Sequence, residues 1–335
     1  MAEFLDHLVR EGAQALSEAE VPSPRIDAEL LAAHALGLSR GELAVKALTH
    51  LQVSQEDAER FRDLVAERRG RTPLQHLTGA APFRTLELRV GPGVFIPRPE
   101  TESVVELVLE DLSMLIDQGV KSPRVIDLGT GSGAIAASVA VEFPTAEVHA
   151  VELSEEAAAW AEMNFATLPH GSAEVTLHRG DLRSAPQLLG RSPALSLGFP
   201  ASDGAASPAQ QRIPQEGWPG AFDVVVSNPP YIPATMVPRD PEVAEHDPEL
   251  ALYGGGVDGM ELPLAVLAAA EGLLRPGGRI IVEHAEVQAS EFARRCAEDF
   301  PFSEVRTHRD LSGRDRATSA VLRQPAAPDV EEWRA

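Results

Sequence analysis

The stretch Asp127-Leu128-Gly129-Thr130-Gly131-Ser132-Gly133 decides the fold of this chain. Its first two residues end a β-rich run at 124–128, and an apolar segment follows it at 134–141. Glycines at alternate positions allow a tight turn in which backbone N–H groups approach a ligand at the start of a helix. The pattern therefore predicts a strand, a glycine-rich turn and a helix, as in a nucleotide-binding half-sheet.

Acidic residues follow the next two predicted strands. Glu152 comes directly after 148–151, where a carboxylate can accept hydrogen bonds from both hydroxyls of a ribose. Asp181 and Leu182 follow the third strand, where the acid can meet an adenine amino group and the leucine can cover the ring. A helix cap is an equally good interpretation of Asp181. Because NAD and S-adenosylmethionine both bind half-sheets of this kind, these residues leave the cofactor open.

A second turn, Asn228-Pro229-Pro230-Tyr231, follows the apolar run 222–227. A proline has no N–H and a fixed φ, so two in succession end the strand and leave backbone carbonyls free to accept hydrogen bonds. The residue before each proline is held in extended geometry. Such a stiff corner, rich in acceptors, suits a planar NH2 group. A turn that merely ends a strand is the alternative, but corner and glycine turn together favour S-adenosylmethionine.

Helical patterns alternate with short β-rich runs over the larger part of the chain. The predicted strands are 124–128, 147–151, 175–178, 222–227 and 279–283. This alternation predicts an α/β fold with a mainly parallel sheet and helices on both faces.

The composition limits the possible partners. The chain has 335 residues and a formal net charge of -22, which opposes loose binding to phosphate backbones. Cys296 is the single cysteine, so an intramolecular disulfide and a cysteine-rich metal site are excluded, consistent with a reducing, cytoplasmic location. No His, Asp and Glu cluster has metal-ligand spacing, so no metal is predicted. We also expect no signal peptide and no membrane span.

The predicted domain boundaries follow changes in pattern along the chain. We expect a helical domain at 1–73, a hairpin linker at 74–95, an α/β domain at 96–324 with a flexible loop at 184–220, and a disordered tail at 325–335. Ser54 and Asp57 predict the start of a helix that runs to about Arg69 and stops at Gly70.

These motifs, taken together, resemble one known family over nearly the whole chain: the protein-(glutamine-N5) methyltransferases of peptide chain release factors. The resemblance is carried by 75–79 (QHLTG), 95–102 (FIPRPETE), 127–133, 228–231 (NPPY), 256–259 (GVDG), Glu283-His284 and 309–316 (RDLSGRDR). It implies a seven-stranded, Rossmann-like class I S-adenosylmethionine-dependent methyltransferase domain behind a small helical domain that recognises the substrate.

The resemblance also implies a substrate, the glutamine of the Gly-Gly-Gln motif in class I release factors, and hence a role in translation termination. A monomer that binds neither nucleic acid nor membrane is expected. The expected cofactor-binding residues are Asp127, Gly129, Thr130, Gly131, Ser132, Gly133, Glu152, Asp181, Leu182 and Asn228. The expected catalytic residues are Asn228, Pro229 and Tyr231, and these with Pro230 are expected to bind substrate.

The chemistry expected at the corner is mainly placement. An amide nitrogen is a poor nucleophile, so the Asn228 side-chain oxygen and the Pro229 carbonyl would accept both amide protons and aim the nitrogen at the methyl group. Tyr231 would pack against the amide and exclude water, with no general base required. Roles for Arg98, Glu100 and Thr101 stay open, since a helix cap at Thr101 explains them nearly as well.

Three other functions fit parts of the sequence. An amino-group methyltransferase acting on adenine or guanine of DNA or RNA would use the same corner, but it predicts a basic track. Residues 239–261 instead hold one basic residue, Arg239, against Asp240, Glu242, Glu245, Asp247, Glu249, Asp258 and Glu261. Such a rim would repel phosphate and could steer a basic protein domain. A non-catalytic adapter and a nicotinamide oxidoreductase are the remaining alternatives.

Overall fold

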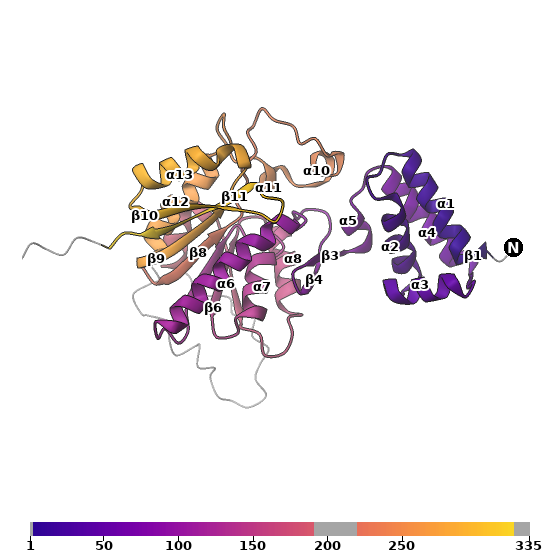
Figure 1. Ribbon diagram of the computed structural model, residues 1–335, viewed down its shortest axis with the longest axis horizontal. Coiled ribbons are helices and arrows are strands. Elements are labelled where there is room, and N and C mark those ends of the chain that lie inside the picture. The colour runs from indigo at the N-terminus through magenta and orange to yellow at the C-terminus, as the bar shows by residue number, and fades with distance from the viewer. Residues whose placement is uncertain (1–2, 191–219, 325–335) are drawn as a thin grey trace, which may run out of the picture. The chain divides into compact units, whose positions relative to one another are not determined.

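The computed structural model describes residues 3–190 and 220–324. Contacts divide the chain into two compact units (Figure 1). The helical unit comprises Met1–Ala81, Arg89–Ile96 and Val237–Asp247, and the α/β unit comprises Pro82–Leu88, Pro97–Met236 and Pro248–Ala335.

Helices make up most of the helical unit. They are α1 (Leu5–Glu18), α2 (Pro24–Leu36), α3 (Arg40–Leu48), α4 (Gln55–Arg69) and α5 (Leu74–Thr78), while β1 (Glu3–Phe4) pairs antiparallel with β2 (Gln52–Val53). Leu8, Leu31 and Phe61 are buried in a shared core. The predicted cap of α4 is confirmed, because the Ser54 side chain accepts a hydrogen bond from the Asp57 N–H.

A buried ion-pair cluster joins α10 (Pro241–His246) to the other helices of this unit. Arg68 donates from Nε to Asp27 at 2.8 Å, and its Nη1 lies 2.9 Å from a Glu242 carboxylate oxygen. Arg71 reaches the second oxygen of Glu242 at 2.7 Å. Two carboxylates thus balance two guanidinium groups, with Glu242 shared between both arginines, and such buried charges are tolerated only when they are paired.

Among the described residues, seven strands form one sheet in the order β10-β11-β9-β8-β5-β6-β7. They are β5 (Arg124–Leu128), β6 (Glu147–Glu152), β7 (Val175–Arg179), β8 (Phe222–Ser227), β9 (Leu274–Glu283), β10 (Phe302–Arg309) and β11 (Asp315–Leu322). Neighbours from β9 through β7 are parallel, whereas β11 is antiparallel to both β9 and β10. The predicted α/β class and seven-stranded sheet are confirmed.

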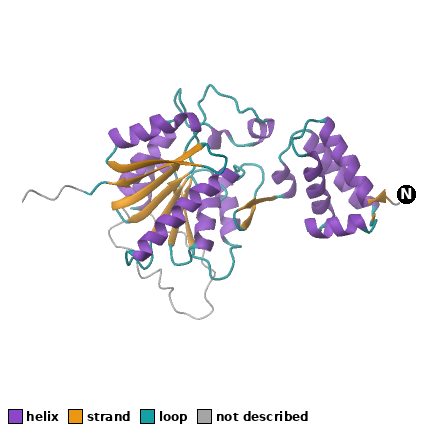
Figure 2. Cartoon of the chain, viewed as in Figure 1, coloured by secondary structure: helices purple, strands orange, loops and turns teal. Residues whose placement is uncertain are grey.

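Helices cover both faces of this sheet (Figure 2). One apolar core contains α6 (Glu102–Asp117), α7 (Ala134–Glu142) and α8 (Glu155–Phe165), and the other contains α9 (Ala185–Leu189), α12 (Glu261–Leu273) and α13 (Ala289–Glu298). Successive strand residues alternate between the cores, as Val125 and Ile126 do. Both faces of a central strand are therefore apolar, which explains the uninterrupted apolar runs in the sequence.

The chain order changes direction between β5 and β8. The chain runs from β5 outward to β6 and β7, then returns to the other side of β5 with β8 and β9. A crevice forms at such a switch point, at the carboxyl ends of the parallel strands, and ligands of α/β sheets bind there. The glycine turn follows β5 and the proline corner follows β8, so both predicted motifs lie at this place.

The expected α/β domain, 96–324, differs from the observed units in one segment. Val237–Asp247 is grouped with the helical unit, because Glu242 pairs with arginines of that unit. Nothing in the local sequence marks this docking, since the ion pairs join residues far apart in the chain.

Two other segments also depart from the expected pattern. The linker begins with helix α5 before β3 (Ala80–Phe83) and β4 (Leu86–Arg89) pair as the predicted hairpin. The expected loop 184–220 begins with helix α9, because Ala185 and Leu189 are buried against the sheet and Pro186 suits a first helical turn. The rest of that loop, 191–219, and the expected tail at 325–335 lie outside the described residues.

Short elements complete the α/β unit: η1 (Pro99–Thr101), η2 (Leu182–Ser184), α11 (Glu249–Leu252) and η4 (Glu286–Gln288). Within 3–190 and 220–324, no helix has the length and apolar character needed to cross a bilayer.

Replacing Glu242 by alanine is expected to loosen α10 from the other helices, because Arg68 and Arg71 lose their shared carboxylate. Amide hydrogen exchange across 237–247 should accelerate roughly tenfold or more, about 1.4 kcal/mol of local opening free energy. Glu245→Ala is the matched control, since Glu245 is exposed on the same helix. Equal protection in the two variants would show that the ion pairs do not hold this segment.

Candidate active site

The glycine turn and the proline corner are joined directly. β5 and β8 are parallel neighbours, with Asp127 opposite Val226. The Ser227 hydroxyl donates a hydrogen bond to the Leu128 carbonyl at 2.5 Å, immediately before each turn begins. Because Ser227 is fully buried, this bond fixes the two turns side by side.

The backbone of the glycine turn requires glycine. Gly129, Gly131 and Gly133 have φ of 76°, 59° and 86°, a region that side chains disfavour. A Cβ on Gly133 would also lie 2.5 Å from the Phe165 ring. The Asn164 side chain donates to the Ser132 carbonyl at 2.8 Å and holds the turn from α8. The conformation of the turn is thus fixed by its glycines and by α8.

Glu152 orients this turn. One carboxylate oxygen accepts from the Gly131 N–H and the other from the Ser154 N–H, both at 2.8 Å. Each oxygen keeps a second lone pair, so the carboxylate can still accept hydrogen bonds from two hydroxyl groups. Glu152 lies at the end of β6 with acceptor capacity to spare, and its contact with a ribose stays a prediction.

Asp127 is buried beneath the turn with unused acceptor capacity. Its Oδ2 accepts a hydrogen bond from the Thr130 hydroxyl at 2.6 Å, whereas Oδ1 has no partner at normal geometry. Burial raises the pKa of this carboxyl to about 7, against the lowering effect of Thr130 and the Ala136 N–H, and the Glu152 charge raises it further. A positive charge bound near the turn would stabilise the ionised form of this buried carboxyl.

Asp181 acts as a helix cap, the second of the two expected roles. Its side chain accepts from the Arg183 N–H at 2.8 Å and pairs with the Arg183 guanidinium. These hydrogen bonds hold the pKa of Asp181 below its usual value. Leu182 is buried close to Gly129, against the glycine turn, and its expected contact with an adenine ring stays a prediction. An adenine contact by Asp181 stays a prediction.

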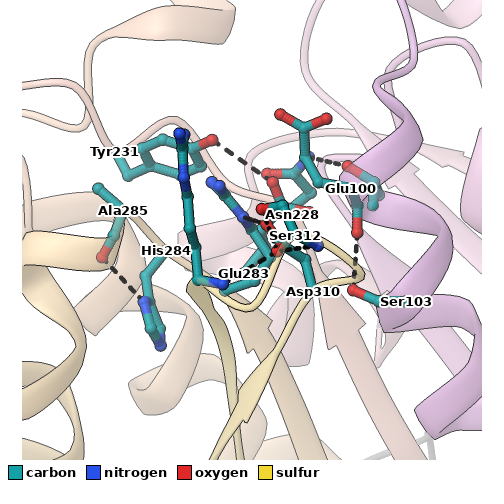
Figure 3. Close-up of polar contacts among 12 residues, drawn as sticks. Glu100, Ser103, Asn228, Tyr231, Glu283, His284, Ala285, Asp310 and Ser312 are labelled. Atoms are coloured by element: carbon teal, nitrogen blue, oxygen red, sulfur yellow. Dashed lines mark hydrogen bonds and ion pairs between the residues drawn. The ribbon is translucent and has the colours of Figure 1, made fainter.

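At the proline corner, the side chains of Asn228 and Tyr231 each make a hydrogen bond within the protein (Figure 3). Asn228 Nδ2 donates to the Thr101 hydroxyl at 3.1 Å, and the Tyr231 hydroxyl donates to Glu283 at 3.4 Å. Thr101 makes no helix-cap hydrogen bond, so its side chain serves the corner instead of α6. With its NH2 group engaged, Asn228 leaves its side-chain oxygen for a ligand.

The backbone of the corner is held by Gln288 of η4 and by the loop around 254–259, which includes the motif 256–259. Gln288 donates from Nε2 to the carbonyls of Tyr231 and Asp258, at 2.9 and 2.7 Å. A Cβ on Gly254 would lie 2.6 Å from the Pro230 carbonyl, and one on Gly259 would lie 2.2 Å from the Tyr231 carbonyl. The glycines at 254 and 259 therefore let this loop pack directly on the corner.

Glu283 is the main site residue that the sequence analysis missed. It ends β9, is buried, and has its pKa raised to about 7 by burial. A hydrogen bond from Thr101 and the charge of Arg316 lower that pKa, while the charge of Glu100 raises it. The available signal was an acid that directly follows an apolar strand.

Both ring nitrogens of His284 are hydrogen-bonded within the protein, which is typical of a structural histidine. Its Nδ1 lies 3.0 Å from the Ala285 carbonyl and its Nε2 lies 2.9 Å from the Thr318 hydroxyl, so one nitrogen donates and the other accepts. Burial lowers the pKa of this histidine and keeps it neutral.

Within the described ranges, no set of three His, Cys, Asp or Glu residues could hold a metal ion.

The acidic segment 239–261 carries less free charge than the sequence implies. Glu242 is neutralised by Arg68 and Arg71, and Asp247 is buried. Glu249 and Asp258 are exposed in the α/β unit and keep their charge available.

Substitution of Gly133 by alanine is expected to disrupt the turn, because the new Cβ meets Phe165 in addition to the strained φ. We expect a loss of about 2–4 kcal/mol in unfolding free energy, measured by chemical denaturation. Gly171→Ala is the matched control: its φ is +95° but no atom lies within 4 Å, so it should lose only about 1–2 kcal/mol. Equal losses would mean that the contact with Phe165 is unimportant.

Comparison with known proteins identifies the family. Residues 7–79 match the family model of the PrmC N-terminal domain, and residues 85–187 match that of the methyltransferase small domain. Among solved structures, the Mtq2–Trm112 complex of E. cuniculi, responsible for methylation of the eRF1 translation termination factor, is 20% identical. The matched residues make up 69% of this chain and 99% of the chain from that structure, with a TM-score of 0.38.

Two bacterial relatives are much closer in sequence. The release factor glutamine methyltransferase of Streptomyces coelicolor is 42% identical over 313 residues, which cover 93% of this chain and 96% of that protein. The release factor glutamine methyltransferase of Bifidobacterium longum is 37% identical over 322 residues, which cover 95% and 99%. At this identity over nearly the full length of both proteins, the chain belongs to the release factor glutamine methyltransferase family.

Proposed function

We propose that this enzyme transfers a methyl group from S-adenosylmethionine to the side-chain amide nitrogen, N5, of the glutamine in the Gly-Gly-Gln motif of class I peptide chain release factors. The observation that carries the proposal is the Asn228 side-chain oxygen, left free at a corner of acceptors directly beside the glycine turn. Family membership supports the same assignment.

The residues present fit S-adenosylmethionine. The N–H groups of the glycine turn at 129, 130, 131 and 133 are already bonded within the protein, in contrast to the expectation from the sequence. The fit rests instead on Glu152, which keeps acceptor capacity for a ribose, and on the buried carboxyl of Asp127, whose charge suits a positive charge nearby. The cofactor-binding residues we assign are Asp127, Gly129, Thr130, Gly131, Ser132, Gly133, Glu152, Asp181, Leu182 and Asn228. When bound, this cofactor supplies an electrophilic methyl group on a sulfonium sulfur.

The corner places the substrate amide. The Asn228 Oδ1 and the Pro229 carbonyl accept the two amide protons, which aims the nitrogen without requiring it to be a strong nucleophile. The same two acceptors stabilise the positive charge that develops on the nitrogen. No general base is needed, because a protonated N-methyl amide is strongly acidic.

Pro230 and Tyr231 complete the substrate site. The Tyr231 ring packs on the amide and excludes water, while its hydroxyl is held by Glu283. Burial raises the pKa of Tyr231, so the phenol stays protonated and remains a donor to the carboxylate.

The partner in this proposal is a protein, not a nucleic acid. A net charge of -22 opposes a phosphate chain, whereas a basic release factor domain is attracted. Two glycines before the target glutamine provide a narrow loop that can enter the corner. A monomeric enzyme acting in the cytoplasm, where release factors work, is part of the same proposal.

Mass spectrometry of a class I release factor after incubation with the enzyme and S-adenosylmethionine tests this function. We expect one added methyl group on the motif glutamine, and none on a factor whose glutamine is changed to alanine. Asn228→Ala should lower the rate at least about 100-fold, about 2.7 kcal/mol, while cofactor affinity changes little. An unmodified factor, with methylation of DNA or RNA instead, would overturn the proposal.

Cofactor affinity should depend on pH through Asp127. Its pKa of about 7 in the free enzyme means that a bound positive charge lowers the pKa and releases a proton at pH 6. The dissociation constant should therefore fall roughly tenfold from pH 6 to pH 8 and then level off. Calorimetry measures this dependence.

Two variants isolate the source of that dependence. Asp127→Asn should remove the slope. Asp181→Asn should keep it, because Asp181 already has a lowered pKa and is ionised throughout this range. A wild-type affinity that does not change with pH would contradict the role given to Asp127.

A further inference from the structure

Glu283 is a buried carboxyl group at the end of β9, and no step of the proposed reaction uses it. Two site residues depend on it nevertheless. The Tyr231 hydroxyl donates to its Oε1 at 3.4 Å. The Thr101 hydroxyl also hydrogen-bonds to this carboxyl and lowers its pKa, and Thr101 in turn accepts from Asn228 Nδ2 at 3.1 Å. Figure 3 shows Asn228, Tyr231 and Glu283 grouped at the corner.

The direction of these hydrogen bonds follows from the chemistry of an ionised carboxylate. A carboxylate only accepts, so the hydroxyls of Thr101 and Tyr231 must spend their single protons on it. Thr101 is then left with lone pairs and can receive only a donor. Of the two ends of the Asn228 amide, only the NH2 group can face Thr101, and the oxygen must face the substrate.

We propose that Glu283 is a positioning residue for the methyl transfer, because it fixes the orientation of the Asn228 amide through Thr101 and holds Tyr231 directly. The inference rests on the proposed function of the corner. Without an acceptor-only group behind it, the Thr101 hydroxyl can rotate and donate to Asn228. The amide then turns and presents its NH2 group to the NH2 group of the substrate, where two donors oppose each other.

Four groups from three other segments face Glu283. Thr101 and Glu100 come from η1, Tyr231 from the corner, and Arg316 from β11. Arg316 pairs with Asp310 at 3.1 Å, so its charge near Glu283 is shared with a second acid. The adjacent His284 is neutral because burial lowers its pKa. Glu283 is thus partly compensated by one shared cation, and it titrates near neutral pH.

Glu283→Gln separates positioning from structural support. The glutamine has nearly the same shape, but it presents an NH2 group to one of its two hydroxyl partners, so the fixed direction of the hydrogen bonds is lost. The pKa of Glu283 is raised in the folded state, so ionisation above about pH 7 lowers stability relative to a neutral side chain. The variant should therefore be at least as stable as the wild type at pH 8.

The experiment measures release factor methylation by the full-length enzyme at saturating S-adenosylmethionine from pH 6 to 9, together with thermal melting. Glu283→Gln should lower kcat at least about tenfold at pH 8, with unchanged cofactor affinity and no drop in melting temperature. Wild-type kcat should decrease below about pH 7 as Glu283 is protonated, whereas the variant should show no such decrease. Glu286→Gln, at an exposed acid nearby, is the charge control.

Two variants of Thr101 provide a second test of the inference. Thr101→Val removes the hydroxyl and should reduce kcat as Glu283→Gln does, while Thr101→Ser retains the hydroxyl and should restore most of the activity. A Glu283→Gln enzyme with wild-type kcat across the pH range would overturn the inference, as would a loss of activity that only follows a loss of stability. If the wild type methylates no release factor, the proposed function fails instead.

Discussion

The hydrogen bond from Ser227 to the Leu128 carbonyl joins the two halves of the site. It exists because β8 is the parallel neighbour of β5, although 99 positions separate the bonded residues. That pairing places the glycine turn and the proline corner at the same edge of the sheet. A chain that placed β8 anywhere else in the sheet would keep both motifs but separate the methyl donor from its acceptor.

Two buried carboxyl groups lie at this edge, and both oppose stability. Asp127 and Glu283 each have a pKa raised to about 7, with burial as the main cause. A buried acid with incomplete hydrogen bonding raises the free energy of the folded state. The extensive apolar cores on both faces of the sheet allow the fold to tolerate them. Such groups at a binding site are typical of functional residues rather than structural ones.

The sequence predicts those features that depend on neighbouring residues, and it fails for features that depend on contacts between residues far apart in the chain. The strands at 124–128 and 222–227 were predicted with their observed bounds, because a strand buried on both faces is a local apolar run. Helix α9 was missed, since its two buried anchors are visible only against the sheet. The Glu242 ion pairs and the link from Asn228 through Thr101 to Glu283 join distant positions, and no local pattern reveals them.

The proposed recognition of an amide at the corner depends on the donors that the corner lacks. Pro229 and Pro230 have no N–H, the Asn228 NH2 group is bound to Thr101, and the Tyr231 hydroxyl is bound to Glu283. In the proposed function, what the corner presents to a ligand is the Asn228 oxygen and backbone carbonyls, so an NH2 group is satisfied and a carboxylate meets acceptors. A glutamate differs from glutamine only in that group, and burying its charge among acceptors carries a large free-energy penalty. In the proposed function, selectivity for glutamine thus arises from the same hydrogen bonds that hold the corner in place.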